Sequence, residues 1–132
     1  MNYLLDTNIC IYLIKRQPPQ VLARFQQRVP GDIGISTVSL AELEYGAAKS
    51  RFPERNRQAL EQFILPLLIC NFNADAAAAY GLLRTQLERA GMPIGPLDLM
   101  IAAHALSLNV TLVTHNIREF ERVAGLRVET WV

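Results

Sequence analysis

The sequence predicts a single α/β domain in which helices flank both faces of a central, mainly parallel, twisted β-sheet. Short apolar runs alternate along the chain with longer amphipathic segments, which is typical of stacked βαβ units. The 132 residues suit one domain, and 51% hydrophobic with 19% charged residues is sufficient for one buried core. We find no linker, repeat or low-complexity segment, and therefore assign residues 1–132 to one domain.

The chain begins with the segment that organises this prediction. Residues 1–6 carry a short apolar run that ends on Asp6, which is typical of a central strand of a parallel sheet. A helix is expected over 8–15, and Pro18-Pro19 separates it from a second helix over about 20–28.

The next segment contains the second expected strand. A turn that includes Pro30 precedes the apolar run 33–36, which predicts a strand. Apolar residues then follow a helical period from 39 to about 49, and Pro53 opens another helix that reaches about residue 65.

The second half of the chain repeats this alternation. The run 67–72 predicts a strand, and Asn73 is expected to cap a helix over 74–90 that stops at Gly91. A turn-rich loop over 91–96 then delivers Asp98 to the first turn of the next helix, which ends near residue 109. The remaining expected elements are a strand over 110–114, a short helix over 117–123 and a last strand over 126–129.

Charge and hydropathy limit the possible classes of function. The net charge of +1 neither requires nor excludes nucleic acid as a partner. Arginine greatly outnumbers lysine, and guanidinium groups suit bidentate phosphate contacts. The basic residues form two local runs, which are equally compatible with solvated helix faces: Lys49, Arg51, Arg55 and Arg57, then Arg118 and Arg122.

No stretch of the sequence is apolar for long enough to suggest a membrane span, and Asp6 interrupts the position where a signal peptide would need its apolar region. We therefore expect a cytoplasmic protein. Cys10 and Cys70 each lie in an apolar segment without metal-site spacing, and are expected to be buried free thiols.

Polar side chains gather at one edge of the predicted sheet. Asp6 ends the first strand, Glu42 and Asp98 are expected in first turns of helices, and Asn116 and Glu119 follow the fourth strand. Right-handed crossovers keep the carboxyl ends of parallel strands together, so these side chains are expected to converge on one crevice. Carboxylates at such short distances suppress one another's ionisation unless a cation neutralises them, and an oxygen-only ligand set indicates Mg²⁺ or Mn²⁺.

Each acid also has a purely structural interpretation. Asp6 precedes a helix and is a suitable N-cap. Ser39 and Glu42 have the spacing of a capping box, in which the glutamate binds the backbone of the capping serine. Glu119 is compatible with an ordinary exposed position in a polar turn. Asp98 lies in an otherwise apolar segment, where a charge needs a partner, and this favours a role in a site.

The two histidines have less clear roles. His104 follows Asp98 by six residues, about 240° around a helix, so it is expected in the core or at its rim rather than beside Asp98. His115 is expected at the mouth of the crevice, where it either fills the loop or contacts a substrate phosphate.

Several other classes of site are excluded because their motifs are absent. The chain has no G-x-G-x-x-G after its first strand, which excludes a dinucleotide site, and no G-x-x-x-x-G-K-[ST], which excludes a P-loop. It has no lysine after Lys49, which a phosphoaspartate receiver needs, and it has Asn8 where a haloacid-dehalogenase-like phosphatase needs its second aspartate.

Four blocks of this sequence, in order and spanning the chain, resemble PIN-domain ribonucleases, and within them the VapC toxins of bacterial toxin-antitoxin modules. The blocks are Leu5-Asp6-Thr7-Asn8, Ile35–Gly46, Ile94–Ala105 and Val113–Phe120. The resemblance implies a PIN-like fold and metal-dependent hydrolysis of structured RNA, with a tRNA-like substrate favoured. It also implies inhibition by a cognate VapB antitoxin whose C-terminal segment occupies the active-site groove.

The resemblance assigns Asp6, Glu42 and Asp98 as the acidic triad. Asp6 and Asp98 would hold Mg²⁺ or Mn²⁺ directly, and Glu42 would bind through water or orient the attacking water. The family often has aspartate at one of the positions that Asn116 and Glu119 occupy here, so either residue is a candidate further ligand and the number of ions, one or two, stays open. The expected supporting residues are Thr7, Asn8 and Thr114 next to the ligands. Arg84 and Arg118 are expected to contact the RNA backbone, and His115 is a further expected RNA contact.

Two other classes of function remain possible from the sequence. A PIN-fold module could act by binding its partner without cutting, although the complete triad argues against this. A nuclease of related architecture could act on DNA, because both nucleic acids present phosphates. The apolar helices over 39–65 additionally suggest a homodimer interface.

Overall fold

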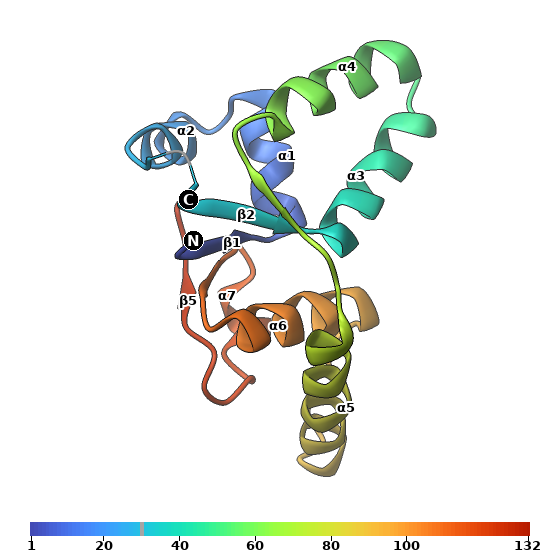
Figure 1. Cartoon of the computed structure of the whole chain (residues 1–132), viewed down its shortest axis with the longest axis vertical. Helices are drawn as coiled ribbons and strands as arrows, with labels where there is room; N and C mark the ends of the chain where they lie inside the picture. The colour runs from blue at the N-terminus through green and yellow to red at the C-terminus, as the bar shows by residue number, and fades with distance from the viewer. Residues whose placement is uncertain (30) are drawn as a thin grey trace.

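The computed structural model describes residues 1–29 and 31–132, and Pro30, part of the expected turn before the second strand, lies outside the described residues. Five strands form one parallel sheet in the order β3-β2-β1-β4-β5 (Figure 1). They are β1 Tyr3–Leu5, β2 Ile33–Ser36, β3 Leu68–Cys70, β4 Thr111–Val113 and β5 Val128–Glu129. The α/β class with a central parallel sheet is confirmed.

The order of the strands reverses beside β1. From β1 the chain continues to β2 and β3 on one side of the sheet, and reaches β4 and β5 on the other. The register pairs Leu4 with Gly34 and Leu112, and Leu5 with Val113. Because the strand order reverses next to β1, the carboxyl end of this strand is where an open α/β sheet binds ligands.

Helices cover both faces of the sheet, as the sequence predicts (Figure 1). The helices are α1 Thr7–Lys15, α2 Pro19–Gln26, α3 Thr37–Ala48, α4 Pro53–Ile64, α5 Ala74–Arg89, α6 Pro96–Leu108 and α7 Ile117–Phe120. Consecutive residues of β1 point to opposite faces: Leu5 belongs to the core with α1, α2 and α4, whereas Leu4 belongs to the core with α5, α6 and α7.

The helix ends show which local signals determine the boundaries. Asn73 caps α5 by accepting a hydrogen bond from the Ala76 amide at 3.0 Å, as expected, and Gly91 adopts a left-handed φ of 69° directly after this helix. Pro96 is the first residue of α6, which places Asp98 in the first turn.

The expected start of α3 is wrong by two residues. Ser36, not Ser39, is the N-cap, and its Oγ accepts a hydrogen bond from the Val38 amide at 3.0 Å. The chain therefore turns into the helix directly at the end of β2. This excludes the capping box between Ser39 and Glu42, and moves Glu42 from the first turn to the second.

The two cysteines are free, but only one is fully buried. Cys10 lies in the core, whereas Cys70 is half-buried because β3 is an edge strand. Among the described residues, no helix combines the length and the apolar character needed to cross a bilayer.

Candidate active site

Asp6 lies at the centre of the site and also caps a helix. Its side chain is only 2% exposed. Oδ1 accepts a hydrogen bond from the Thr7 amide at 2.8 Å, and Oδ2 accepts one from Thr114 Oγ1 at 2.7 Å. Burial raises the pKa of Asp6, these two hydrogen bonds partly offset the effect, and the nearby charges of Glu42 and Glu119 raise the pKa further. Capping and site chemistry are therefore two roles of the same carboxylate.

Glu42 reaches Asp6 through a threonine. Thr7 Oγ1 donates a hydrogen bond to Glu42 Oε1 at 2.7 Å, while the Thr7 amide binds Asp6. Thr7 thus holds one oxygen of each carboxylate and leaves Glu42 Oε2 free of hydrogen bonds among the described residues. The second-turn position of Glu42 in α3 is what allows its side chain to extend over the start of α1.

Asp98 approaches from the opposite side of the sheet, in the first turn of α6. Its pKa is raised to about 7, first by burial and then by the charges of Asp6 and Glu119, a hydrogen bond with Glu119 and the charge of Glu42. The four carboxylates therefore act on one another, which is the convergence that the sequence predicts.

Glu119 belongs to this cluster rather than to an exposed turn. Its Oε1 accepts a hydrogen bond from the Gly95 amide at 3.1 Å, and its Oε2 accepts a short one from Asn116 Nδ2. The backbone N–H of Asn116 donates a hydrogen bond to Thr114 Oγ1 at 3.0 Å. Asn116 therefore orients Glu119, and Glu119 is the better candidate for a further metal ligand.

The donor set fits a hard divalent cation. All four groups are carboxylates, and among the described residues no ion pair joins Asp6 or Asp98 to a cationic side chain. Within residues 1–29 and 31–132, no three acidic, histidine or cysteine side chains lie in an arrangement that could hold a metal ion by themselves. This arrangement suits Mg²⁺, which usually keeps several waters and takes only one or two direct carboxylates.

The remaining expected site residues lie around the cluster. Thr114 is fully buried against Asp6, whereas Asn8 is exposed at the start of α1. His115 is exposed and meets the Tyr12 ring edge to face, with centroids 6.0 Å apart. Arg118 is exposed on α7. Arg84 lies on α5, where it binds Glu88 at 2.8 Å and the Tyr80 hydroxyl at 3.1 Å.

His104 is a core residue, as its position on α6 predicts. It is 1% exposed, packs edge to face against Phe72, and its Nδ1 lies 2.8 Å from Ser36 Oγ. Ser36 Oγ also accepts the Val38 amide hydrogen, so one hydroxyl contacts both the start of α3 and the His104 ring. Sequence reasoning misses both Ser36 and the Gly95 amide as parts of the site; the strand-end position of Ser36 is the one local signal that indicates a cap.

This fold and this carboxylate cluster define a class of protein. The PIN domain family model matches residues 3–126. The chain is 48% identical to the "tRNA(fMet)-specific endonuclease VapC" of Shigella flexneri over 99% of this chain and 98% of that protein. It is 47% identical to "Ribonuclease VapC2" of Haemophilus influenzae over 100% of this chain and 99% of that protein.

A solved structure agrees with these relatives. The crystal structure of VapBC2 from Rickettsia felis bound to a DNA fragment from their promoter contains a chain with a TM-score of 0.94 and 44% identity, and the match covers 100% of both chains. The chain therefore belongs to the PIN-domain family and, within it, to the VapC ribonucleases.

Proposed function

We propose that this protein is a Mg²⁺- or Mn²⁺-dependent endoribonuclease that hydrolyses structured RNA in the cytoplasm and acts as the growth-inhibiting toxin of a toxin-antitoxin pair. The observation that supports this most strongly is the convergence of Asp6, Glu42, Asp98 and Glu119 at the carboxyl end of β1. The name of the Shigella flexneri relative favours a tRNA-like substrate.

The residues have distinct tasks in this proposal. Asp6, at the end of β1, and Asp98, in the first turn of α6, would hold the ion directly, and Thr114 fixes Asp6 by its hydrogen bond to Oδ2. Glu119 is positioned by Gly95 and Asn116 as a ligand for a further ion or its waters. When bound between these carboxylates, a divalent ion would lower the pKa of a water and would offset charge on the scissile phosphate.

Glu42 is suited to orient the attacking water. Thr7 holds its Oε1, so Oε2 is left to accept a hydrogen bond from that water. Hydrolysis forms a bond between the water oxygen and phosphorus and breaks the bond to the leaving ribose oxygen. The carboxylate that receives the hydrogen bond also draws the proton away from the nucleophile.

A groove beside the carboxylates suits the proposed VapB-type antitoxin. A cavity of about 280 Å³ lies between α1, α3 and α4, with Ile11, Ile14 and Leu43 on its apolar walls and Glu42 at its edge. A C-terminal antitoxin segment with apolar side chains and one cationic group would fill this groove and compensate the acidic cluster.

A homodimer through the 39–65 region is a separate proposal. Three apolar residues of this region that are exposed to solvent support it: Tyr45, Phe52 and Leu65, at 65%, 53% and 74% exposure.

The substrate class can be tested directly. Antitoxin-free protein is incubated with Mg²⁺ or Mn²⁺ and either total RNA or single-stranded DNA. We expect discrete cleavage of RNA, with tRNA among the cut species, and intact DNA. Cleavage of DNA alone would instead identify a DNA-directed nuclease, and cleavage of neither would identify a module that only binds.

A further inference from the structure

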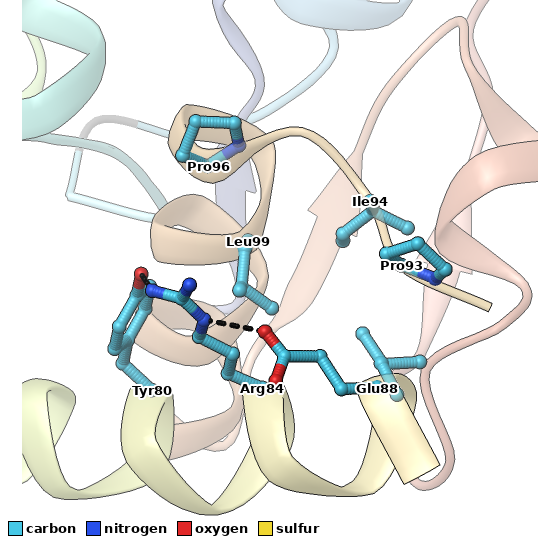
Figure 2. Close-up of a pocket in the computed structure, with 8 residues that line it drawn as sticks. Tyr80, Arg84, Glu88, Pro93, Ile94, Pro96 and Leu99 are labelled. Atoms are coloured by element: carbon cyan, nitrogen blue, oxygen red, sulfur yellow. Dashed lines mark hydrogen bonds and ion pairs between the residues drawn. The ribbon is translucent and has the colours of Figure 1, made fainter. Parts of the chain in front are cut away.

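A second cavity lies beside the loop that precedes Asp98 and contacts the carboxylate cluster through Gly95. It has a volume of about 240 Å³ and is formed between α5 and residues 93–99. In Figure 2, Tyr80, Arg84 and Glu88 extend from α5 toward Leu99 and the prolines of the loop. This volume lies below the range of about 300–1,000 Å³ that is usual for drug-sized ligands, and suits a single planar ring system.

The cavity combines an apolar floor with a polar mouth. Leu87 and Leu99 are buried beneath it, at 4% exposure each. Arg84 and Glu88 face solvent, with 56% and 57% of their side chains exposed. Their mutual bond uses Arg84 Nε and Glu88 Oε1, so Arg84 Nη2 and Glu88 Oε2 form no other hydrogen bond among the described residues. A donor and an acceptor therefore lie side by side above an apolar surface, which is what the edge of a nucleobase requires.

The loop connects this cavity directly to the carboxylate cluster. Pro93, Ile94 and Pro96 line the cavity, while the Gly95 amide between them binds Glu119 and Asp98 follows in the next turn. Arg122, which follows α7, donates a hydrogen bond from Nη1 to the Pro93 carbonyl at 3.0 Å and holds the loop in place. The loop therefore lines the cavity with Pro93 and Ile94 and contacts the carboxylate cluster through the Gly95 amide.

We propose that this cavity binds one unstacked nucleobase next to the cleaved phosphodiester, with Arg84 and Tyr80 as its specificity-determining residues. This inference rests on the proposed ribonuclease function. It revises the sequence-based expectation that Arg84 contacts the RNA backbone, because a guanidinium beside an aromatic ring and an apolar floor is better suited to a base. A bare phosphate would gain nothing from Leu87 and Leu99.

The test combines enzyme variants with an altered substrate. The RNA that the enzyme cuts is prepared with an abasic ribose on either side of the cleavage position in turn, and kcat/KM is compared with that of the intact RNA. For the wild-type enzyme, we expect loss of the base at one of these positions to lower kcat/KM roughly tenfold, from the usual energy of base stacking. In Arg84→Ala, the intact RNA should be cut more slowly and the abasic penalty should largely disappear.

Two further variants separate a base contact from simple charge attraction. Arg89→Ala removes an exposed arginine of the same helix that does not line the cavity, and should keep the full abasic penalty. Arg84→Lys keeps the positive charge but not the planar group, and should behave like Arg84→Ala. Equal abasic penalties in all enzymes, or full rescue by Arg84→Lys, would overturn the base subsite. A wild-type enzyme that cuts no RNA would instead reject the proposed function, and the subsite with it.

Discussion

Ser36 Oγ and His104 Nδ1 lie 2.8 Å apart, and this contact joins the start of α3 to the middle of α6. The two helices carry Glu42 and Asp98, so the buried pair braces the two sides of the carboxylate cluster. Ser36 also caps α3, which makes one hydroxyl responsible for both the helix start and the contact between helices.

This brace predicts a stability effect for His104→Phe. The substitution preserves an aromatic ring against Phe72 but leaves the buried Ser36 hydroxyl without its histidine partner, at a cost of about 1–3 kcal/mol. Urea unfolding measures the difference. His115→Phe, at the exposed histidine, is the matched control and should change stability by less than about 0.5 kcal/mol. Equal effects of the two substitutions would contradict the brace.

Thr114→Val tests how Asp6 is held. The substitution preserves shape but removes the hydrogen bond to Asp6 Oδ2 and the acceptor for the Asn116 amide. Removing a residue that hydrogen-bonds to a metal ligand typically lowers metal affinity or activity by about 10–100-fold, and we expect the activity of Thr114→Val to fall by a factor in this range. Thr114→Ser keeps the hydroxyl and should retain most of the activity. Metal affinity measured by Mn²⁺ titration shows whether the loss acts through Asp6; an unchanged affinity in Thr114→Val would argue against it.

Glu119→Gln tests the far side of the site. Glutamine can still accept the Gly95 hydrogen bond but has no charge to attract a cation or to raise the pKa of Asp98. We expect Mn²⁺ to bind less tightly to Glu119→Gln than to the wild type, whereas Glu121→Gln, at an exposed acid nearby, should bind normally. Identical titrations for the two variants would remove Glu119 from the ligand set.

The raised pKa of Asp98 predicts how the metal-free protein responds to pH. The pKa rises from 3.8 in the unfolded chain to about 7 in the fold, so the folded state binds more protons between these values. The stabilisation that the protonated group provides is complete below pH 3.8 and is lost as pH rises through about 7. In chelator, Asp98→Asn should therefore have a higher Tm than the wild type at pH 8, by a few degrees, and this difference should be smaller at pH 5 and disappear as the pH falls to about 4. A lower Tm of the variant at pH 8 would show that the ionised carboxylate is not destabilising.

The sequence predicts the parts of the site that depend on local signals. Asp6 is located by the end of an apolar run, and Asp98 by a proline that starts its helix. The contacts of the other acids are not local: Thr7 meets Glu42 across 35 positions, and Gly95 meets Glu119 across 24. These pairs depend on how α3 and α7 pack on the sheet, which no short pattern encodes. The start of α3 is missed for a related reason, because two serines compete as caps and only the strand end at Ser36 decides between them.

The most direct test of the central claim is RNA cleavage by antitoxin-free protein as a function of Mg²⁺ concentration, for the wild type, Asp6→Asn and Asp98→Asn, with Glu121→Gln as the control. Thermal unfolding of each variant verifies that it is folded. We predict that chelator abolishes cleavage, that Asp6→Asn and Asp98→Asn each lower the rate by about a hundredfold or more, and that Glu121→Gln cleaves like the wild type. Cleavage that persists unchanged in both aspartate variants, or in chelator, would contradict a metal-dependent centre built on Asp6 and Asp98.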